Sequence, residues 1–191
     1  MIKLGVLGST RGTDLEAIIQ AIKNNRIEAE ISIVISNIKD AFILQRAEKY
    51  GINNLFISHK NKAREAFDKE VSTVLKKKNI ELILLIGFMR ILSSRFCIEW
   101  KDRILNVHPS LLPKYSGGMD TNVHDQVLSN GDTETGCTIH FVNENVDEGP
   151  ILVQKKCQVL RNDNTQSLKQ KVQSLEGEAY VEAIKLIQGK Q

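Results

Sequence analysis

Short apolar runs alternate with amphipathic stretches along the first half of the chain. The runs are rich in isoleucine, valine and leucine, a composition typical of buried strands. In the stretches between them apolar residues recur at helical spacing, as they do from Leu15 to Ile22. This pattern predicts strands over residues 2–7, 31–36, 54–57, 82–87 and 103–106. It predicts helices over residues 12–24, 41–50 and 63–78, and a further helix that starts at Ser93.

The regular alternation of strands and helices from residue 2 to residue 108 indicates the fold class. Strands that alternate with helices form parallel sheets, because each helix carries the chain back across the sheet. Residues 82–86 are apolar at every position, as in central parallel strands that helices cover on both faces. We therefore expect an α/β protein with a Rossmann-like, doubly wound, mostly parallel sheet.

The pattern changes after Pro113. A short helix is expected over residues 123–128, followed by two strands over residues 138–142 and 151–159. The segment between these strands is rich in turn-forming residues, so the strands should form an antiparallel hairpin at the edge of the sheet. A long final helix is expected over about residues 165–187.

Composition and charge narrow the classes of function. Apolar residues make up 41% of the 191 positions and charged residues 26%, as in ordinary globular domains. The formal net charge of +3 is too small to indicate a nucleic-acid partner, and aromatic residues, at 5%, are too few for an RNA-stacking platform. The sequence contains no signal peptide and no apolar run of membrane length. We expect one cytoplasmic domain over residues 1–191, with neither a nucleic-acid nor a membrane partner.

The cysteines say little about function. Cys97, Cys137 and Cys157 are scattered and lack the spacing of metal ligands. An odd, scattered set is typical of reduced thiols. We therefore expect no metal site.

A glycine-containing loop, residues 8–14, separates the first strand from the first helix. The amide groups and the dipole at the start of a helix favour an anion, so this loop is a candidate phosphate site. Its spacing matches neither the dinucleotide fingerprint nor the P-loop. Thr13 or Asp14 can instead cap the helix, and the sequence leaves this alternative open.

A second candidate site follows the strand at residues 103–106. Asn106 and His108 are two positions apart, so on a strand both side chains point to the same side. The carboxyl ends of parallel strands are where ligands bind. An amide can donate to a developing oxyanion, and an imidazole can donate or shuttle a proton. The alternative is that both side chains only satisfy the backbone of the loop.

Motifs at the ends of several predicted strands form one set. Its members are Gly12-Thr13-Asp14, Arg64, Gly87-Phe88-Met89-Arg90-Ile91-Leu92, Asn106-Val107-His108-Pro109-Ser110-Leu111-Leu112-Pro113, Thr138-Ile139-His140-Phe141-Val142 and Asp147-Glu148-Gly149-Pro150. In this combination, and over nearly the whole chain, they resemble the folate-dependent formyltransferases, and among these the phosphoribosylglycinamide formyltransferases.

The resemblance implies an enzyme of purine biosynthesis. Such an enzyme moves a formyl group from 10-formyltetrahydrofolate, the co-substrate, to the amine of N1-(5-phosphoribosyl)glycinamide, and it needs no metal. The partners are then two small molecules, and the protein is a monomer or a weak homodimer. Residues 1–100 would form the phosphate- and substrate-binding half of the domain, and residues 101–191 the catalytic and folate-binding half.

The resemblance also implies roles for three catalytic side chains. Asn106 and His108 would stabilise the oxyanion of the tetrahedral intermediate. Asp147 would raise the pKa of His108 and relay the proton of the attacking amine. Taken alone, Asp147 is better explained as a turn-forming residue before Gly-Pro, and only the Asn106-x-His108 segment favours the catalytic role.

Binding residues follow from the same resemblance. Gly12, Thr13 and Asp14 would hold the substrate phosphate through backbone amides, and Glu176 would contact the ribose hydroxyls. The residues implied for the formyl donor are Arg64, Met89, Arg90, Ile91, Leu92, Asn106, Asn143 and Val146. We expect His140 to be a structural histidine outside the catalytic set.

The chain departs from the family pattern at several places. Gly-Thr-Asp stands where the family often has Gly-Ser-Asn, and a carboxylate beside a phosphate is unfavourable unless it faces away. Residues 116–120 replace a shorter Pro-Gly turn. After Glu176, Gly177 and Val181 stand in place of the usual histidine and a later proline. No departure touches Asn106, His108 or Asp147.

The sequence is also compatible with other functions. A related enzyme can use a different amine or hydrolyse the formyl donor, and a non-catalytic module can bind folate or a nucleotide. Turnover that depends on the glycinamide amine distinguishes the expected transferase from each of these.

Overall fold

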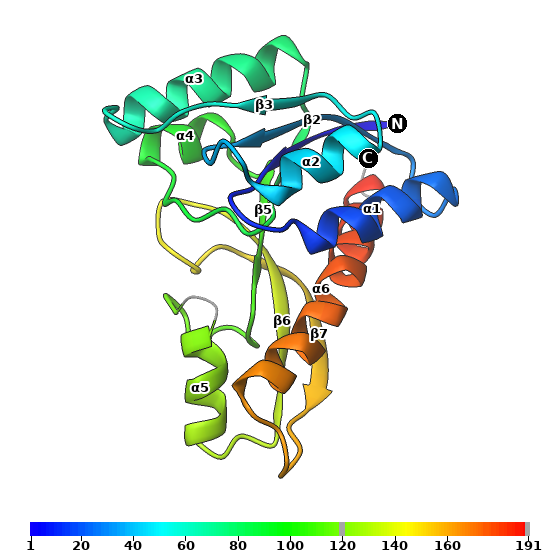
Figure 1. Ribbon diagram of the computed structural model, residues 1–191, viewed down its shortest axis with the longest axis vertical. Helices are drawn as coiled ribbons and strands as arrows, with labels where there is room; N and C mark the ends of the chain where they lie inside the picture. Colours follow the sequence, from blue (N-terminus) through cyan, green and yellow to red (C-terminus); the bar gives the residue numbers. More distant parts are fainter. Residues whose placement is uncertain (119–120, 190–191) are drawn as a thin grey trace.

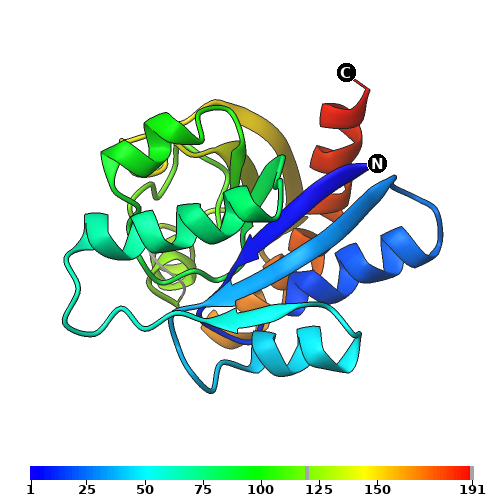
Figure 2. The ribbon, with the colours of Figure 1, turned by 90° about the horizontal axis from the view of Figure 1, so that it is seen from above.

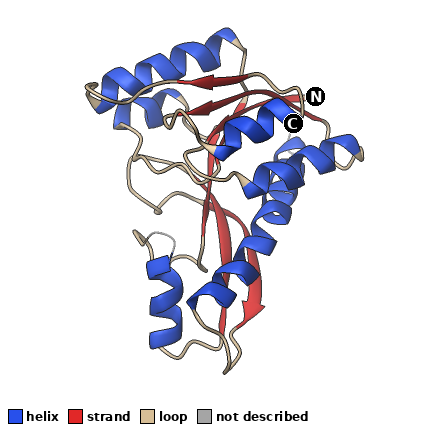
Figure 3. Ribbon diagram, in the orientation of Figure 1, coloured by secondary structure: helices blue, strands red, loops and turns tan. Residues whose placement is uncertain are grey.

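The computed structural model describes residues 1–118 and 121–189 (Figure 1). Residues 119 and 120, part of the expected 116–120 insertion, lie outside the described residues. The described elements are, in chain order, β1 (Ile2–Leu7), α1 (Thr13–Lys23), β2 (Ala29–Ser36), α2 (Phe42–Lys49), β3 (Asn54–Phe56), α3 (Arg64–Lys77), β4 (Leu82–Leu85), α4 (Ser94–Glu99), β5 (Ile104–His108), α5 (Thr121–Ser129), β6 (Glu134–Phe141), β7 (Ile151–Gln158) and α6 (Thr165–Gln188). Figure 3 shows these helices and strands by colour.

Within the described ranges the strands form one seven-stranded sheet in the order β3-β2-β1-β4-β5-β6-β7. Strands β1 to β5 are parallel, whereas β6 runs antiparallel to β5, and β7 antiparallel to β6. The chain moves outward through β2 and β3, then returns to the other side of β1 with β4. The carboxyl ends of strands at such a reversal are where doubly wound folds bind ligands. The predicted fold class, including the edge hairpin and the long final helix, is confirmed.

Helices cover both faces of the parallel part of the sheet (Figure 2). Leu82 and Leu84 of β4 belong to the core that includes α1, α2 and α6. Ile83 and Leu85 belong to the core that includes α3 and α4. Burying each such side chain contributes about 1.5–3 kcal/mol, which explains why this strand is apolar at every position.

Several strand boundaries differ from the prediction; for example, β2 begins at Ala29 rather than at residue 31, and β6 spans Glu134–Phe141 rather than residues 138–142. Two further differences bear on the site. β4 ends at Leu85 rather than at Gly87, because Gly87 adopts a positive φ of 58° and turns the chain into a loop. β5 continues to His108, so both Asn106 and His108 lie on a strand and their side chains are fixed by the sheet. A larger part of the site therefore lies on a regular strand than the sequence predicts.

Helix α6 runs along the molecule beside β6 and β7 and reaches α1 (Figure 1). The helix begins with a capping box in which Asn164 and Ser167 satisfy each other's backbone amides. Tyr180, fully buried, donates its hydroxyl hydrogen to the carbonyl oxygen of Leu85 at 2.5 Å. α6 is thereby tied to the carboxyl end of β4. Among the described residues, no helix is long and apolar enough to span a membrane.

Candidate active site

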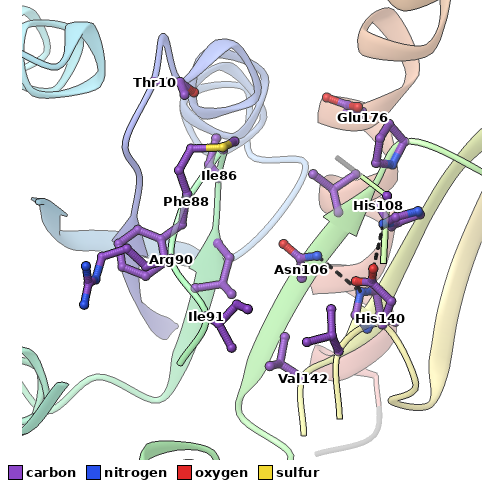
Figure 4. Close-up of a pocket in the computed structure, with 18 of the residues that line it drawn as sticks. Thr10, Ile86, Phe88, Arg90, Ile91, Asn106, His108, His140, Val142 and Glu176 are labelled. Atoms are coloured by element: carbon purple, nitrogen blue, oxygen red, sulfur yellow. Dashed lines mark hydrogen bonds and ion pairs between the residues drawn. The ribbon is translucent and has the colours of Figure 1, made fainter. Parts of the chain in front are cut away.

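The carboxyl ends of the central strands border a cavity of about 820 Å³. The segments that line it are residues 10–14, 85–92, 106–109 and 142–147, together with one side of α6. In Figure 4, Asn106, His108 and His140 lie together on one side of the cavity, and Thr10 and Arg90 lie on the other. Every residue to which the sequence analysis gave a catalytic or binding role lines this one cavity.

His108 is the most constrained side chain of the cavity. Its imidazole is 3% exposed; Nδ1 lies 3.2 Å from Oδ2 of Asp147, and Nε2 lies 2.9 Å from the carbonyl oxygen of Tyr115. Both ring nitrogens therefore face acceptors. A neutral imidazole donates only one hydrogen bond, whereas the imidazolium donates two and satisfies both acceptors. The two acceptors are thus both satisfied only when each ring nitrogen carries a hydrogen.

Asp147 reaches the histidine from the loop between β6 and β7. Its backbone has a φ of 58°, a conformation that aspartate tolerates better than most residues, and the amide of Gly117 donates to its Oδ2 at 2.9 Å. Burial raises the pKa of Asp147, but contacts with His108 and His140 outweigh it and hold the pKa well below its usual range. Asp147 is therefore a carboxylate at neutral pH.

Gly149 allows the loop to deliver Asp147. A Cβ at this position would lie 1.7 Å from the carbonyl oxygen of Phe141, at the end of β6. Only glycine lets the returning chain approach the strand so closely. The Gly-Pro after Asp147 and Glu148 is thus a packing requirement of the hairpin.

His140, expected to be a structural histidine outside the catalytic set, lines the cavity beside Asn106 and Asp147. It pairs with Asn106 across β5 and β6, and its Nε2 lies 3.2 Å from Nδ2 of Asn106 and 3.5 Å from Oδ1 of Asp147. Its Nδ1 lies 2.9 Å from the carbonyl oxygen of Phe141. With the proton on Nδ1, the ring donates to this carbonyl and accepts from the Asn106 amide. Only the antiparallel register brings His140 here, and no local signal in the sequence sets that register.

The phosphate-loop candidate opens directly into α1. Gly12 is the residue before the helix, with a φ of 63°, and no side chain caps the helix. Thr13 and Asp14 therefore do not act as caps. Asp14 is 5% exposed, and burial raises its pKa to about 7. Glu176 lines the same end of the cavity from α6 and is 8% exposed.

Residues 88–92 line the cavity directly after the turn at Gly87. The side chains of Met89 and Ile91 are 51% and 57% exposed, so they do not fill the core. The guanidinium of Arg90 stacks on Phe67 with its Cζ 4.7 Å from the ring centre. The other residues assigned to the formyl donor line the same cavity: Arg64, Leu92, Asn106, Asn143 and Val146.

Among residues 1–118 and 121–189, no group of three or more histidine, cysteine or carboxylate side chains is placed to hold an ion. Cys97, Cys137 and Cys157 are free thiols.

Comparison with known proteins identifies the family of this chain. The formyl transferase family model matches residues 2–184. The phosphoribosylglycinamide formyltransferase of Escherichia coli (strain K12) is 41% identical over 176 residues, which are 92% of this chain and 82% of that protein. The chain belongs to the phosphoribosylglycinamide formyltransferases.

A solved structure of the same family has the same fold. Glycinamide ribonucleotide transformylase 1 from Symbiobacterium toebii matches with a TM-score of 0.93 and 37% sequence identity, over 98% of this chain and 87% of that one. The formyl-transferring enzyme class and the fold class predicted from the sequence are thus confirmed.

Some relatives of this formyltransferase family are much longer. The trifunctional purine biosynthetic protein adenosine-3 of Drosophila melanogaster is 43% identical over 188 residues, 97% of this chain. The chain spans 14% to 18% of the length of the trifunctional relatives that it matches. The likeness to them therefore concerns one part of each.

One departure from the formyltransferase pattern has a structural reason. A Cβ at Gly177, where relatives are expected to carry histidine, would lie 2.5 Å from Cβ of Ala17 in α1. The same Cβ would lie 3.8 Å from Cα of Asp14. Glycine thus lets α6 pack closely against the first turns of α1, and this packing buries Asp14.

Proposed function

We propose that the chain transfers the formyl group of 10-formyltetrahydrofolate to the amine of N1-(5-phosphoribosyl)glycinamide in purine biosynthesis, within the cytoplasm. The observation that carries the proposal is the convergence of Asn106, His108 and Asp147 in one cavity, with His108 Nδ1 3.2 Å from the Asp147 carboxylate. The names of the E. coli relative and of the S. toebii structure support the same substrates.

The carbonyl oxygen of the formyl group needs two donors in the proposed reaction. The amine nitrogen attacks the formyl carbon, the new C–N bond forms, and the oxygen becomes negative. A free hydrogen of the Asn106 amide and Nε2–H of His108 donate to it, and each preorganised donor contributes about 3 kcal/mol. Because Nε2 faces the Tyr115 carbonyl, the formyl oxygen replaces this carbonyl as acceptor when substrate binds.

One proton is transferred in the proposed mechanism. The nitrogen that has attacked loses it through a water molecule to Asp147, and the same proton is passed on to N10 of the folate as the bond between N10 and the formyl carbon breaks. The low pKa of Asp147 keeps it charged beside His108, so ion pairing with the imidazolium is its first role.

The proposed binding sites occupy opposite ends of the cavity. The backbone amides of residues 12–14 hold the phosphate at the start of α1, and Glu176 accepts from the ribose hydroxyls. The 88–92 and 143–146 segments and Arg64 hold the formyl donor. The division into a phosphate-binding half, residues 1–100, and a catalytic half, residues 101–191, stays a prediction, as does the monomer or weak homodimer.

Release of the deformylated folate, followed by absorbance with and without glycinamide ribonucleotide, tests this function. The parent protein should turn over only with the amine, and Asp147→Asn should lower kcat about 10³-fold or more. Glu148→Gln, which neutralises the neighbouring exposed carboxylate, is the matched control and should keep its activity.

Two other results would replace the proposal. Turnover without the amine would identify a hydrolase of the formyl donor. A parent protein that binds the folate but releases no product with glycinamide ribonucleotide would identify a binding module.

A further inference from the structure

Ser9, directly after β1, joins three segments at the edge of the cavity. Its amide donates to the carbonyl oxygen of Gly87 at 3.0 Å. Its hydroxyl accepts from the amide of Met89 at 2.9 Å and donates to Oδ1 of Asn37 at 2.6 Å. Ser9 is 9% exposed, so these bonds are shielded from water. One side chain thus links the carboxyl ends of β1, β2 and β4.

Asn37 fixes the direction of the Ser9 hydroxyl. Because the Met89 amide already donates to the serine oxygen, the hydroxyl hydrogen is free to point at the Asn37 carbonyl group. Asn37 is 5% exposed, and its own position is set by His59, whose Nδ1 lies 3.3 Å from the Asn37 Nδ2 and 3.1 Å from its backbone oxygen. Hydrogen bonds therefore run from the Met89 amide to the Ser9 hydroxyl, and from this hydroxyl to the side chain of Asn37.

The 88–92 segment depends on such outside anchors. Its Met89 and Ile91 side chains are more than half exposed, so the packing of the segment against the core comes from Phe88 and Leu92 at its two ends. At its far end the amide of Ser93 donates to Oδ2 of the buried Asp68 at 2.6 Å. The segment is thus tied by Ser9 close to its start and by Asp68 just after its end.

We propose that Ser9 is a positioning residue for the formyl donor, because its bond to the Met89 amide holds the 88–92 segment in the shape that receives the pterin ring. This inference rests on the proposed function, in which that segment binds the donor. Asn37 acts through Ser9, and neither residue touches the reacting atoms.

Ser9→Ala removes the acceptor of the Met89 amide and leaves the rest of the cavity in place. We expect the KM for 10-formyltetrahydrofolate to rise about tenfold, while kcat and the KM for glycinamide ribonucleotide change less than about twofold. A merely structural loss would lower the amount of active enzyme and so kcat, and would leave both KM values alone.

Ser72→Ala is the matched control. Ser72 is also buried, donates to Glu99 at 2.6 Å and accepts from the Trp100 indole at 3.0 Å, but it lies in α3 outside the cavity lining. Its substitution should leave both KM values unchanged. An equal rise in the donor KM for both variants, or an unchanged donor KM in Ser9→Ala, would overturn the role of Ser9.

Two measurements keep the test independent of folding and of the proposed reaction. In the parent protein without ligand, the Met89 amide should exchange hydrogen at least about tenfold more slowly than the Arg90 amide; equal rates would refute the anchor. Calorimetric titration with 10-formyltetrahydrofolate gives the donor Kd without turnover. A parent protein that binds the donor but transfers nothing would overturn the function alone, and Ser9→Ala should still raise the Kd about tenfold.

Discussion

The two histidines of the cavity differ in what their ring nitrogens face. Both ring nitrogens of His108 face acceptors, the Asp147 carboxylate and the Tyr115 carbonyl. Nδ1 of His140 faces the Phe141 carbonyl, whereas its Nε2 lies 3.2 Å from Nδ2 of Asn106 and 3.5 Å from Oδ1 of Asp147. In the shorter of these two contacts Nε2 accepts from Nδ2, which fixes which end of the Asn106 amide carries the hydrogens.

This orientation of Asn106 leads to a first prediction. His140→Leu removes the acceptor that holds the Asn106 amide, so its donor no longer points steadily at the formyl oxygen. We expect kcat to fall about 10- to 100-fold, with substrate KM values changed less than about threefold. Steady-state kinetics of the purified variant measure this. An unchanged kcat would show that Asn106 orients itself without His140.

Asp14 gives a second prediction, on pH. Burial holds its pKa at about 7 in the folded protein, against an ordinary value of 3.8. Between these values the folded state binds more protons than the unfolded state, so the free energy of unfolding falls as pH rises from 4 to 7. Asp14→Asn removes this pH-dependent loss of stability, because asparagine does not ionise. The free energy of unfolding of the variant, minus that of the parent, should therefore increase by about 1–3 kcal/mol from pH 5 to pH 8, or about 3–8 °C in Tm.

Calorimetric scans at the two pH values measure the Asp14 effect. The exposed Asp40→Asn serves as the control, and its Tm difference from the parent should be the same at both pH values. A difference between Asp14→Asn and the parent that is likewise independent of pH would contradict the raised pKa.

At the scale of elements, the site depends on how the connection between β6 and β7 passes the end of β6. Gly149 allows the chain to pass close to the Phe141 carbonyl, and this close passage sets the position of Asp147, two residues earlier. A substitution in this connection therefore changes stability and the position of Asp147 together.

Gly149→Ala is the third prediction. The new Cβ would lie 1.7 Å from the Phe141 oxygen, so backbone must shift. We expect a loss of about 3 kcal/mol in the free energy of unfolding, about 6–12 °C in Tm, and a fall in kcat from the displaced Asp147. At Gly189, just after α6, a new Cβ would lie 3.5 Å from the carbonyl oxygen of Lys185, an ordinary contact distance. Gly189→Ala should therefore change the Tm little. Equal, small effects of both substitutions would contradict the close approach.

The contact of α6 with the sheet gives the fourth prediction. Tyr180→Phe removes the donor to the Leu85 carbonyl in a fully buried place. We expect a loss of about 1–3 kcal/mol in the free energy of unfolding, measured by urea denaturation with an unchanged slope. A variant as stable as the parent would mean that the Leu85 oxygen finds another donor.

At the scale of the whole molecule, local pattern and long-range register contribute differently to what the sequence can predict. The strand and helix pattern follows from periodicity, so the element order and the doubly wound sheet are predictable. The resemblance assigned Asp147 to His108, but nothing local places His140 opposite Asn106 or Ser9 against Met89. Those neighbours depend on strand register and loop shape, which many distant contacts decide together.

Ligand binding supplies the fifth prediction. The cavity lies between the parallel strands and the edge hairpin, so a bound substrate contacts both parts. Glycinamide ribonucleotide at about 100 times its Kd should stabilise the fold by about 2.7 kcal/mol, or about 5–10 °C in Tm. Glycinamide without the phosphoribosyl group, at the same concentration, should shift the Tm by less than about 1 °C. Equal shifts would refute the phosphate site at residues 12–14.

The packing of α6 against α1 also bears on how the chain folds during synthesis. The apolar side of α1, with Leu15 and Ile18, is buried partly by Tyr180 and Ile184 of α6, which the ribosome makes last among the described elements. Because a domain folds as a unit, the nascent first half cannot complete this packing, and an open apolar groove remains until α6 leaves the exit tunnel. A ribosome stalled before α6 should therefore carry a chain that binds chaperones and is cut readily by proteases. Release of the full chain should end both within seconds.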